Sequence, residues 1–454
     1  MKLFLNNKCL KFRINLMKIL LSEKEMQSFL KVLRERASGR GQEVENRVRA
    51  ILDDVRKTGD SAVLRYTKAF DSLTKEDLRI TPEDISINAK RARKNVVEAL
   101  KTSAKRIKAF HEMQKEESWS FSEGNDLLGQ VIRPLERVGV YVPGGKASYP
   151  STVLMNVIPA QVAGVKEIAL CVPTPRGEIN PYVMAAIKLL GLKEVYGIGG
   201  AQAVGAMAYG TETIKKVDKI VGPGNIFVAT AKKMVFGEVD IDMIAGPSEI
   251  LIIADDSANP AFIAADLLGQ AEHDELASPV LITNSKKLAD TVRGELEKQL
   301  SRLRRKEIAT KSLDNYGAII ITKNIKDAVE LSNSIAPEHL EIMTEKPMDL
   351  LPMIKNAGAI FLGEWTPETL GDYSAGPNHT LPTGGTARFS SPLGVYDFIK
   401  RSSLLNFTKD GFIKLAKTVR TIAAVEGLEA HEKTIRVREG FKTGKKVKKF
   451  LSGE

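Results

Sequence analysis

The fold class follows from three neighbouring runs of sequence, RVGVYV at residues 137–142, STVLMNVIPAQVAGV at 151–165 and EIALCV at 167–172. The outer runs are short and rich in β-branched residues, as buried strands are, and the middle run is long enough for a helix. A strand, a helix and a strand in this order indicate parallel strands joined by a right-handed crossover. These residues therefore favour an α/β fold.

The same alternation continues through six further strand-like runs. They are EVYGI at 194–198, DKIVG at 218–222, EILIIAD at 249–255, PVLITN at 279–284, YGAIIIT at 316–322 and AGAIFLG at 357–363. Apolar helical runs such as PYVMAAIKLLGL and NPAFIAADLLGQAEHD lie between them. Strands that are apolar throughout are buried on both faces of a parallel sheet. We therefore expect eight strands in two α/β domains, residues 136–255 and 256–378.

Helical segments are expected on either side of these domains. Apolar residues recur at helical spacing in VENRVRAILDDVRK and NVVEALKTSAKRIKAF, within an N-terminal region at 17–135. GFIKLAKTVRTIAAVEGLEAHEKTI predicts helices in a C-terminal arm at 379–454. The Gly- and Pro-rich stretch at 371–394 has no hydrophobic period, and structureless loops of that length are usually functional.

Composition and charge limit the class of protein. A chain of 454 residues with 43% hydrophobic residues and two cysteines is neither disordered, collagen-like nor built on disulfides. No run approaches the length of a membrane span, and we expect a cytoplasmic enzyme. The net charge of +11 belongs to the two ends of the chain, because residues 1–20 and 435–454 each carry +5. Residues 1–16 are expected to be a disordered basic extension, with Met17 as an alternative start.

Glycine-rich turns follow three of the predicted strands. They are Pro143-Gly144-Gly145, Gly199-Gly200-Ala201-Gln202 and Gly222-Pro223-Gly224-Asn225. Such turns let backbone amides approach a phosphate, and they are also ordinary punctuation between strands. The run from Gly197 to Gln202 lacks the third glycine of the dinucleotide fingerprint, and the chain has no P-loop motif.

The chain has only five histidines, so each is informative. His111 is expected on the exposed face of a helix. His273 follows Gln270 by three residues near the end of a helix, so both side chains share one face. Glu338 and His339 follow Pro337, a residue that suits a helix start, and an adjacent carboxylate and imidazole supply two proton carriers.

Four side chains are candidate metal ligands, namely Gln270, His273, Asp372 and His431. Nitrogen and oxygen donors without a thiolate suit Zn²⁺ or Mn²⁺. A polar helix end explains Gln270 and His273 equally well, and a histidine near the end of the last helix has an electrostatic reason of its own. Sequence spacing does not establish that the four residues converge. Cys171 ends an apolar strand and is expected to be a buried core thiol.

Six longer motifs, taken in order, resemble histidinol dehydrogenases. They are GPGNIFVATAK at 222–232, IDMIAGPSEILIIAD at 241–255, GQAEHD at 269–274, APEHLE at 336–341, GDYSAGPNHTLPTGGTAR at 371–388 and EGLEAH at 426–431. The resemblance covers about residues 20–435. It implies two incomplete Rossmann-like domains with smaller helical segments, and a zinc-dependent homodimer that oxidises L-histidinol to L-histidine with two NAD⁺, the last step of histidine biosynthesis.

The resemblance also implies roles for individual residues. Glu338 and His339 would be catalytic, with His339 as the base and Glu338 activating water. Zn²⁺, one per subunit, would be held by Gln270, His273, Asp372 and His431. Substrate would contact Ser248, Gln270, His273, His339, Asp372, Glu426 and His431, and NAD⁺ would contact Tyr141, Gln202 and Asn225. The C-terminal arm, with Glu426 and His431, would complete the neighbouring subunit's site.

Two alternatives stay open at this point. The motifs restrict the chemistry more closely than the substrate, so a dehydrogenase of the same fold acting on another amino alcohol is the first. The second is binding of nucleic acid or an anionic surface through the basic ends, although no recognised binding fold accompanies them.

Overall fold

The computed structural model describes residues 16–36, 41–72, 77–144 and 149–440. Most of the predicted basic extension, and the chain after residue 440, lie outside these ranges. The chain divides into two units, which we describe separately. Unit 1 comprises Met1–Lys115 and Pro134–Phe398, and unit 2 comprises Glu116–Arg133 and Ile399–Glu454.

The first sheet of unit 1 has five parallel strands in the order β6-β5-β4-β7-β8. Their bounds are β4 Arg137–Tyr141, β5 Glu167–Cys171, β6 Glu194–Tyr196, β7 Lys219–Val221 and β8 Asp240–Ile241. The chain leaves the central strand β4 towards β5 and β6 and returns on its other side at β7. The strand order therefore reverses between β4 and β7, which is where open α/β sheets form a ligand crevice.

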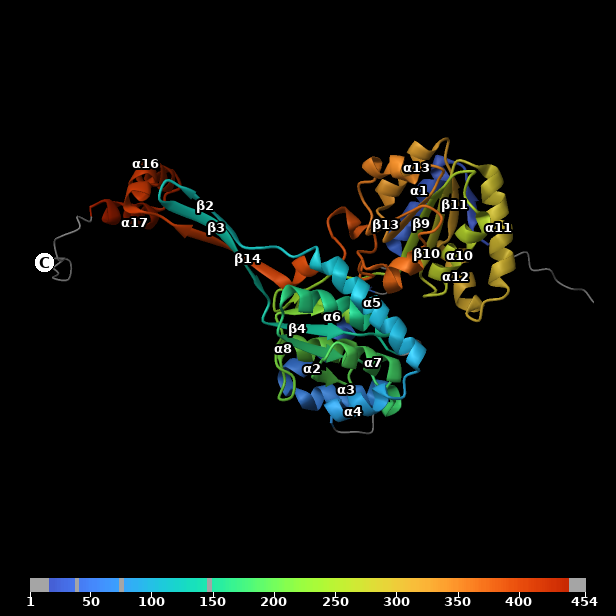
Figure 1. Cartoon of the computed structure of the whole chain (residues 1–454), viewed down its shortest axis with the longest axis horizontal. Coiled ribbons are helices and arrows are strands. Elements are labelled where there is room, and N and C mark those ends of the chain that lie inside the picture. The colour runs from blue at the N-terminus through green and yellow to red at the C-terminus, as the bar shows by residue number, and fades with distance from the viewer. Residues whose placement is uncertain (1–15, 37–40, 73–76, 145–148, 441–454) are drawn as a thin grey trace, which may run out of the picture. The chain divides into compact units, whose positions relative to one another are not determined.

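Helices cover both faces of this sheet (Figure 1). One core lies under α4 Pro82–Ala89, α5 Lys94–Glu112, α6 Pro150–Ala163 and α7 Pro181–Leu189. The opposite core lies under α2 Gly41–Thr58, α3 Asp60–Asp71, α8 Gly200–Tyr209 and α9 Ile226–Val235. The predicted helices of the N-terminal region are thus part of the first domain.

The second sheet has six parallel strands in the order β1-β11-β10-β9-β12-β13. Their bounds are β1 Lys18–Leu20, β9 Glu249–Ala254, β10 Ser278–Thr283, β11 Ala318–Ile321, β12 His339–Met343 and β13 Ala359–Leu362. The helices α10 Pro260–Ala271, α11 Lys286–Leu300 and α12 Lys306–Tyr316 contribute to one core, and α1 Glu23–Glu35 and α13 Ile325–Ile335 to the other.

The eight predicted strands are all present, but the expected boundary at residue 255 is wrong. The strand at 249–254 is β9, and it pairs with β10 and β12 of the second sheet. A run that is apolar throughout shows burial without showing in which sheet it is buried. The extension also ends earlier than expected, because Leu16 is buried in the core of the second domain.

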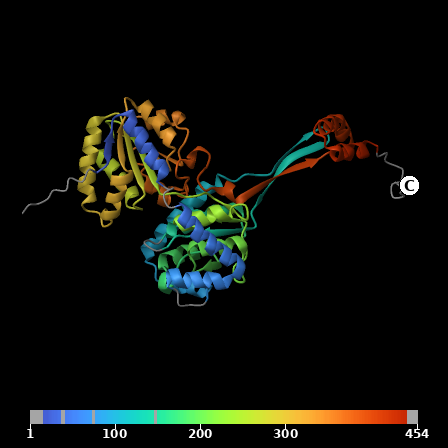
Figure 2. The ribbon, with the colours of Figure 1, turned by 180° about the vertical axis from the view of Figure 1, so that it is seen from behind.

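Unit 2 contains the sheet β14-β3-β2, in which β2 and β3 are antiparallel and which the sequence did not predict. Its strands are β2 Trp119–Glu123, β3 Asp126–Pro134 and β14 Ile399–Asn406, followed by α16 Lys409–Val425 and α17 Glu429–Glu439. Figure 2 shows β2 and β3 running alongside β14, with the two helices at one end of the sheet. Asp126 ties this end together, because its Oδ1 accepts hydrogen bonds from the backbone N–H and the hydroxyl of Thr408, the N-cap of α16, at 2.7 Å each.

Among the described residues, no helix combines the length and the apolar character needed to span a membrane.

Candidate active site

The predicted catalytic pair lies at the amino end of β12 and not at a helix start. Helix α13 ends at Ile335, Ala336 adopts a left-handed conformation with φ +55°, and His339 begins the strand. The expected helix is wrong because Pro337 follows a helix end, and His-Leu-Glu-Ile-Met alternates polar and apolar residues with the period of a strand. His339 and Glu341 therefore project from the same face of β12.

His339 is buried, and its surroundings determine which ring nitrogen carries hydrogen. Nδ1 lies 2.9 Å from the backbone oxygen of Glu249. Because a carbonyl oxygen can only accept, Nδ1 carries the hydrogen and donates it. Nε2 of Gln270, itself a donor, lies 3.1 Å from the same nitrogen, so the shorter contact to Glu249 is the one that the hydrogen on Nδ1 satisfies. In the neutral ring, Nε2 is then the atom that can take up a proton.

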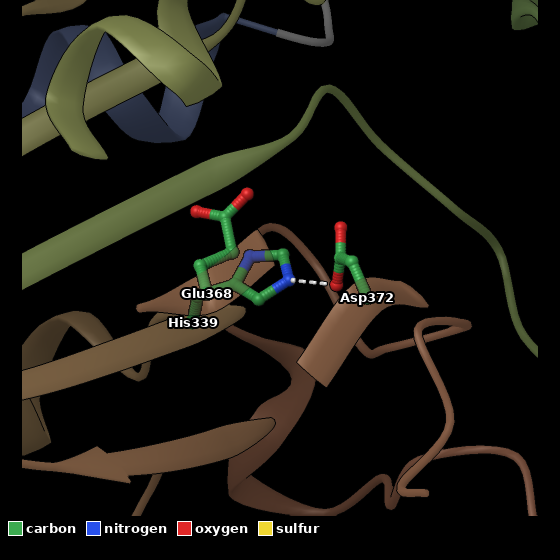
Figure 3. Close-up of side chains that lie close together, drawn as sticks. All are labelled: His339, Glu368 and Asp372. Atoms are coloured by element: carbon green, nitrogen blue, oxygen red, sulfur yellow. Dashed lines mark ion pairs between the residues drawn. The ribbon is translucent and has the colours of Figure 1, made fainter. Parts of the chain in front are cut away.

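Nε2 of His339 faces Asp372, with 3.4 Å to Oδ1, and has no hydrogen-bond partner within the described part of the chain. Figure 3 shows this edge of the ring directed at the carboxylate of Asp372, with Glu368 also beside the ring. Burial disfavours the imidazolium, but the charges of Glu368, Glu338 and Asp372 outweigh burial and raise the pKa of His339 well above its ordinary value. The carboxylates therefore make the neutral imidazole a stronger base and stabilise the imidazolium that forms when Nε2 takes up a proton.

Glu338 lies directly beside the imidazole, with Oε2 at 3.7 Å from Nδ1 of His339. The same oxygen accepts a hydrogen bond of 2.8 Å from the backbone N–H of Glu249. Burial raises the pKa of Glu338 to about 8, although His339 opposes that rise. A carboxyl group with a pKa near neutrality can act as a base without being permanently charged.

Asp372 comes from a short π-helix, η3 Gly371–Ala375, which continues α15 Glu368–Leu370. Single π turns inside helices are rare and occur frequently at functional sites. Burial would raise the pKa of Asp372, but its interaction with His339 lowers it below the ordinary value. His339, Glu368 and Asp372 place ligand atoms within 4.8 Å of one another, as a metal site requires.

Sequence reasoning missed a group of buried carboxyl side chains behind His339. Glu368 is 3% exposed and Glu341 is 1% exposed, and the backbone N–H of Glu368 donates to Oε1 of Glu341 at 2.7 Å. Asp266 of α10 hydrogen-bonds to Glu341, so one of these two groups keeps its proton. Burial raises the pKa of Asp266 to about 6 and that of Glu368 to about 8. The only available signal was the four-residue spacing of Glu368 and Asp372.

The loop that carries Asp372 is held by α5 and α6. Arg106 donates to the backbone oxygens of Ser374 at 2.8 Å and Ala375 at 3.2 Å. His379 lies with Nδ1 at 3.0 Å from the backbone oxygen of Asp372 and Nε2 at 3.3 Å from Oγ1 of Thr152. The Gly- and Pro-rich stretch is thus an ordered support for the site.

The structure brings together part of the predicted metal-ligand set. Gln270, near the end of α10, and Asp372 approach opposite nitrogens of His339, and all three residues belong to unit 1. His273 is exposed two residues beyond the end of that helix and interacts electrostatically with Asp372 and His339. His431 in α17 is exposed and belongs to unit 2, as does Glu426, the C-cap of α16.

Ser248 immediately precedes β9 and is half-buried, with its backbone oxygen accepting from Ser278 N–H at 2.9 Å. Glu249, which sequence reasoning did not single out, contributes its backbone to both Glu338 and His339. Its side chain accepts from the buried Arg36 at 2.6 Å. The site of the second domain therefore lies at the amino ends of β9 and β12, and not at the carboxyl ends that parallel sheets generally favour.

The three residues expected to contact NAD⁺ lie at the carboxyl edge of the first sheet. Tyr141 ends β4, and its hydroxyl accepts from Gly200 N–H at 3.1 Å. Gln202 in α8 is 1% exposed, and its Oε1 has no partner among the residues described. Asn225 is the N-cap of α9, with Oδ1 accepting from Phe227 and Val228. All three surround the switch point between β4 and β7.

The structure confirms the prediction made for Cys171 and contradicts the one made for His111. Cys171 is fully buried in β5, and burial raises the pKa of its thiol far above the usual range, as expected for a core residue. The expectation that His111 is exposed is wrong. It is fully buried near the end of α5, where Nδ1 lies 2.7 Å from Oε1 of Gln114, and Gln114 in turn accepts from Val395 N–H. Helical spacing showed the helix but not the loop that covers this face.

Comparison with known proteins agrees with this geometry. A family model described as histidinol dehydrogenase matches residues 34–439. Histidinol dehydrogenases of Geobacter metallireducens and Aquifex aeolicus are each 55% identical, over 88% and 90% of this chain and 92% and 96% of theirs. The crystal structure of histidinol dehydrogenase from Elizabethkingia anophelis superimposes with a TM-score of 0.88 at 38% identity, covering 93% of this chain and 98% of that one. The chain therefore belongs to the histidinol dehydrogenase family.

Proposed function

We propose that this protein oxidises L-histidinol to L-histidine in two steps, each of which reduces one NAD⁺. The family is one of NAD-dependent oxidoreductases, which supports the reaction class. The observation that carries the proposal is the buried pair of Glu338 and His339, whose two side chains meet around the backbone of Glu249. A two-step oxidation at one carbon needs two proton-transfer groups, and this pair supplies them.

In the first step, His339 takes the proton of the substrate hydroxyl at Nε2 while the carbon gives hydride to NAD⁺. The Nδ1–H bond to Glu249 supports this role, because it leaves Nε2 as the acceptor. The products of the step are an aldehyde, NADH and a proton held by the imidazole. The nicotinamide carries the hydride, and the protein contributes orientation and proton transfer.

In the second step, the aldehyde must add water before a second hydride can leave. Glu338 accepts a proton from that water while the imidazolium of His339 returns its proton to the aldehyde oxygen. The resulting hydrate loses hydride to a second NAD⁺, and His339, neutral again, removes a hydroxyl proton. The raised pKa of Glu338 supports this division, because a carboxyl group that titrates near 8 is a stronger base than an ordinary one. The net change consumes one water and two NAD⁺ for each alcohol.

We further propose that Gln270, His273 and Asp372 hold one Zn²⁺ per subunit, with His431 from a second copy of the chain as fourth ligand. The donor set supports this assignment, since it offers nitrogen and oxygen atoms and the only cysteine among the described residues is buried in the other domain. When bound, Zn²⁺ would act as a Lewis acid that orients the imidazole and amine of the substrate.

A homodimer whose arms exchange between subunits is the corresponding proposal for assembly. Unit 2 supports it by exposing apolar side chains that monomers usually bury. On the sheet these include Trp119, Phe121 and Leu405, each more than half exposed, and along α16 they include Ile413, Val419, Ile422 and Val425. A second copy of unit 2 is the occupant we propose for these surfaces.

The test of the proposed function is substrate selectivity. NADH formation is followed with L-histidinol and, as controls, amino alcohols without the imidazole, such as L-phenylalaninol. We expect efficient turnover of L-histidinol alone, its loss on removal of metal by chelation and its recovery with Zn²⁺. Faster oxidation of a control alcohol would contradict the assignment of substrate, and full activity of the metal-free protein would contradict the role of zinc.

A further inference from the structure

Gly222, the first residue after β7, is held on both sides by a buried ion pair. Its N–H donates to Oδ2 of Asp242 at 2.8 Å, and its carbonyl oxygen accepts from Nζ of Lys232 at 2.9 Å. Nζ of Lys232 and Oδ1 of Asp242 form an ion pair, with the two side chains 2% and 0% exposed. The three groups form a closed ring around both peptide groups of Gly222.

The ring joins three segments of the first domain. Gly222 begins the four-residue turn Gly222-Pro223-Gly224-Asn225, Lys232 lies on the helix α9 that follows this turn, and Asp242 follows β8. Side chains of a helix lean towards its N-terminus, which lets Lys232 reach back over two turns to Gly222. Asn225 anchors the other end of the turn through its hydrogen bonds to Phe227 and Val228.

The position of Gly222 affects the proposed nucleotide site directly. Gly222 has φ +114°, and a Cβ atom there would lie 2.0 Å from the backbone oxygen of Tyr141. The backbone of the turn therefore touches the end of β4 at the switch point. Tyr141 and Asn225 are two of the three proposed NAD⁺ contacts, so the placement of Gly222 sets how they stand relative to each other.

A buried ion pair is a weak source of net stability, because desolvation of both charges offsets their attraction. An apolar pair of equal volume would fill the same space, but it would leave the N–H and the carbonyl of Gly222 without partners. Asp242 also accepts a hydrogen bond of 2.6 Å from the backbone N–H of Met243. Besides their ion pair, both side chains therefore hydrogen-bond to backbone groups at the carboxyl edge of the first sheet. The main contribution of the ion pair is therefore to fix the position of the Gly222 backbone.

We infer that Lys232 and Asp242 are positioning residues for NAD⁺, which hold the turn at Gly222–Asn225 in the conformation that binds the nucleotide. The inference rests on the proposed function, because it takes the carboxyl edge of the first sheet as the NAD⁺ site. Neither side chain is required to touch the nucleotide.

The test compares Lys232→Met with Lys219→Met in the full-length holoenzyme. Both changes keep an aliphatic side chain and remove a lysine–aspartate ion pair of the first domain. Lys219 pairs with Asp240 at 2.9 Å, at the amino ends of β7 and β8, away from the turn. Lys232→Met is expected to raise the KM for NAD⁺ by up to about 100-fold, since a displacement of about 1 Å in a positioned group can cost that much. The KM for L-histidinol should stay unchanged, and Lys219→Met should alter neither.

An unchanged KM for NAD⁺ in folded Lys232→Met would overturn the inference, as would equal increases in the KM values of both substrates. Asp242→Asn is the second variant, since it keeps an acceptor for Gly222 while removing the charge, and it should raise the KM for NAD⁺ less. If neither variant folds, the pair serves the folding of the domain and the inference fails.

Asn225→Ser separates this inference from the site assignment. Serine keeps a capping oxygen for α9 but removes the amide proposed to contact NAD⁺. If Asn225→Ser weakens NAD⁺ binding and Lys232→Met does not, only the inference fails. If Asn225→Ser and Tyr141→Phe both leave the KM for NAD⁺ unchanged, the proposed site itself is wrong.

Discussion

At the scale of single residues, the chemistry depends on which atoms of Glu338 and His339 remain available. The backbone of Glu249 takes Nδ1 of His339 and one oxygen of Glu338, and so leaves Nε2 and the other carboxylate oxygen for substrate and water. No sequence pattern shows such an arrangement, because Glu249 lies about 90 residues before both side chains in the sequence. The pair was nonetheless identifiable from sequence as two proton carriers, and the motif resemblance assigned their roles.

Glu338→Gln should separate the two half-reactions. The amide cannot accept a proton from water, so oxidation of the aldehyde should slow by about 100-fold or more, while oxidation of the alcohol by His339 should change little. Because burial raises the pKa of Glu338 to about 8, the group is a base only above that value, and the aldehyde step of the unmodified enzyme should speed up as pH rises through about 8.

Single-turnover measurements that start from L-histidinol and from the aldehyde test this division. His339→Asn is the control, because it should slow both half-reactions. Equal slowing of both by Glu338→Gln, or a rise with pH that survives the substitution, would show that Glu338 does not activate the water.

At the scale of elements, the prediction of strands succeeded where burial was complete and failed where polar side chains were functional. All eight apolar runs are strands. The segment of β12 was taken for a helix start because Pro337 suits one, and His339 and Glu341 interrupt the apolar pattern that would have indicated a strand. The strands of unit 2 escaped detection for the opposite reason, since β2 is exposed along its whole length and has no buried face to reveal it. The strand β8 was also missed, because it is only two residues long and shows no periodic pattern.

The contact between α10 and β12 predicts a specific dependence of stability on pH. The pKa of Asp266 is about 6 in the folded chain against 3.8 ordinarily, so the folded state keeps a proton that the unfolded state has lost between these values. Its contribution to stability is therefore present at low pH and decreases as pH rises through about 6. Asp266→Asn should reduce that decrease, as seen in urea unfolding between about pH 4 and pH 7.

Asp290→Asn, which changes an exposed carboxylate on α11, is the matched control for this measurement. If the two variants show the same dependence of unfolding free energy on pH, the hydrogen-bonded carboxyl pair of Asp266 and Glu341 does not contribute as described.

At the scale of the whole molecule, the sequence separates an almost neutral body from two basic ends. The body contains both α/β domains, and sequence alone predicted their class and eight of their strands, without β1, β8 and β12. It could not predict that Gln270, His339 and Asp372 meet, because residues about 70 and 30 positions apart converge only through the order of strands in the sheet. The fourth proposed ligand, His431, depends on a second copy of the chain.

Mixed oligomers test the proposed exchange of arms. Subunits carrying His339→Asn and subunits carrying His431→Asn should each be inactive, and co-refolding them in equal amounts should restore about a quarter of the unmodified activity, because half of the dimers then hold one intact site. Failure to recover activity when mass spectrometry confirms mixed dimers would show that each chain completes its own site.

The central claim is a four-electron oxidation in one active site, and the ratio of NADH to substrate tests it most directly. A limiting amount of L-histidinol is converted to completion with excess NAD⁺, and NADH, L-histidine and free aldehyde are measured together. We predict two NADH per L-histidinol, with L-histidine as the product and no accumulated aldehyde. One NADH per L-histidinol with release of the aldehyde would contradict the account.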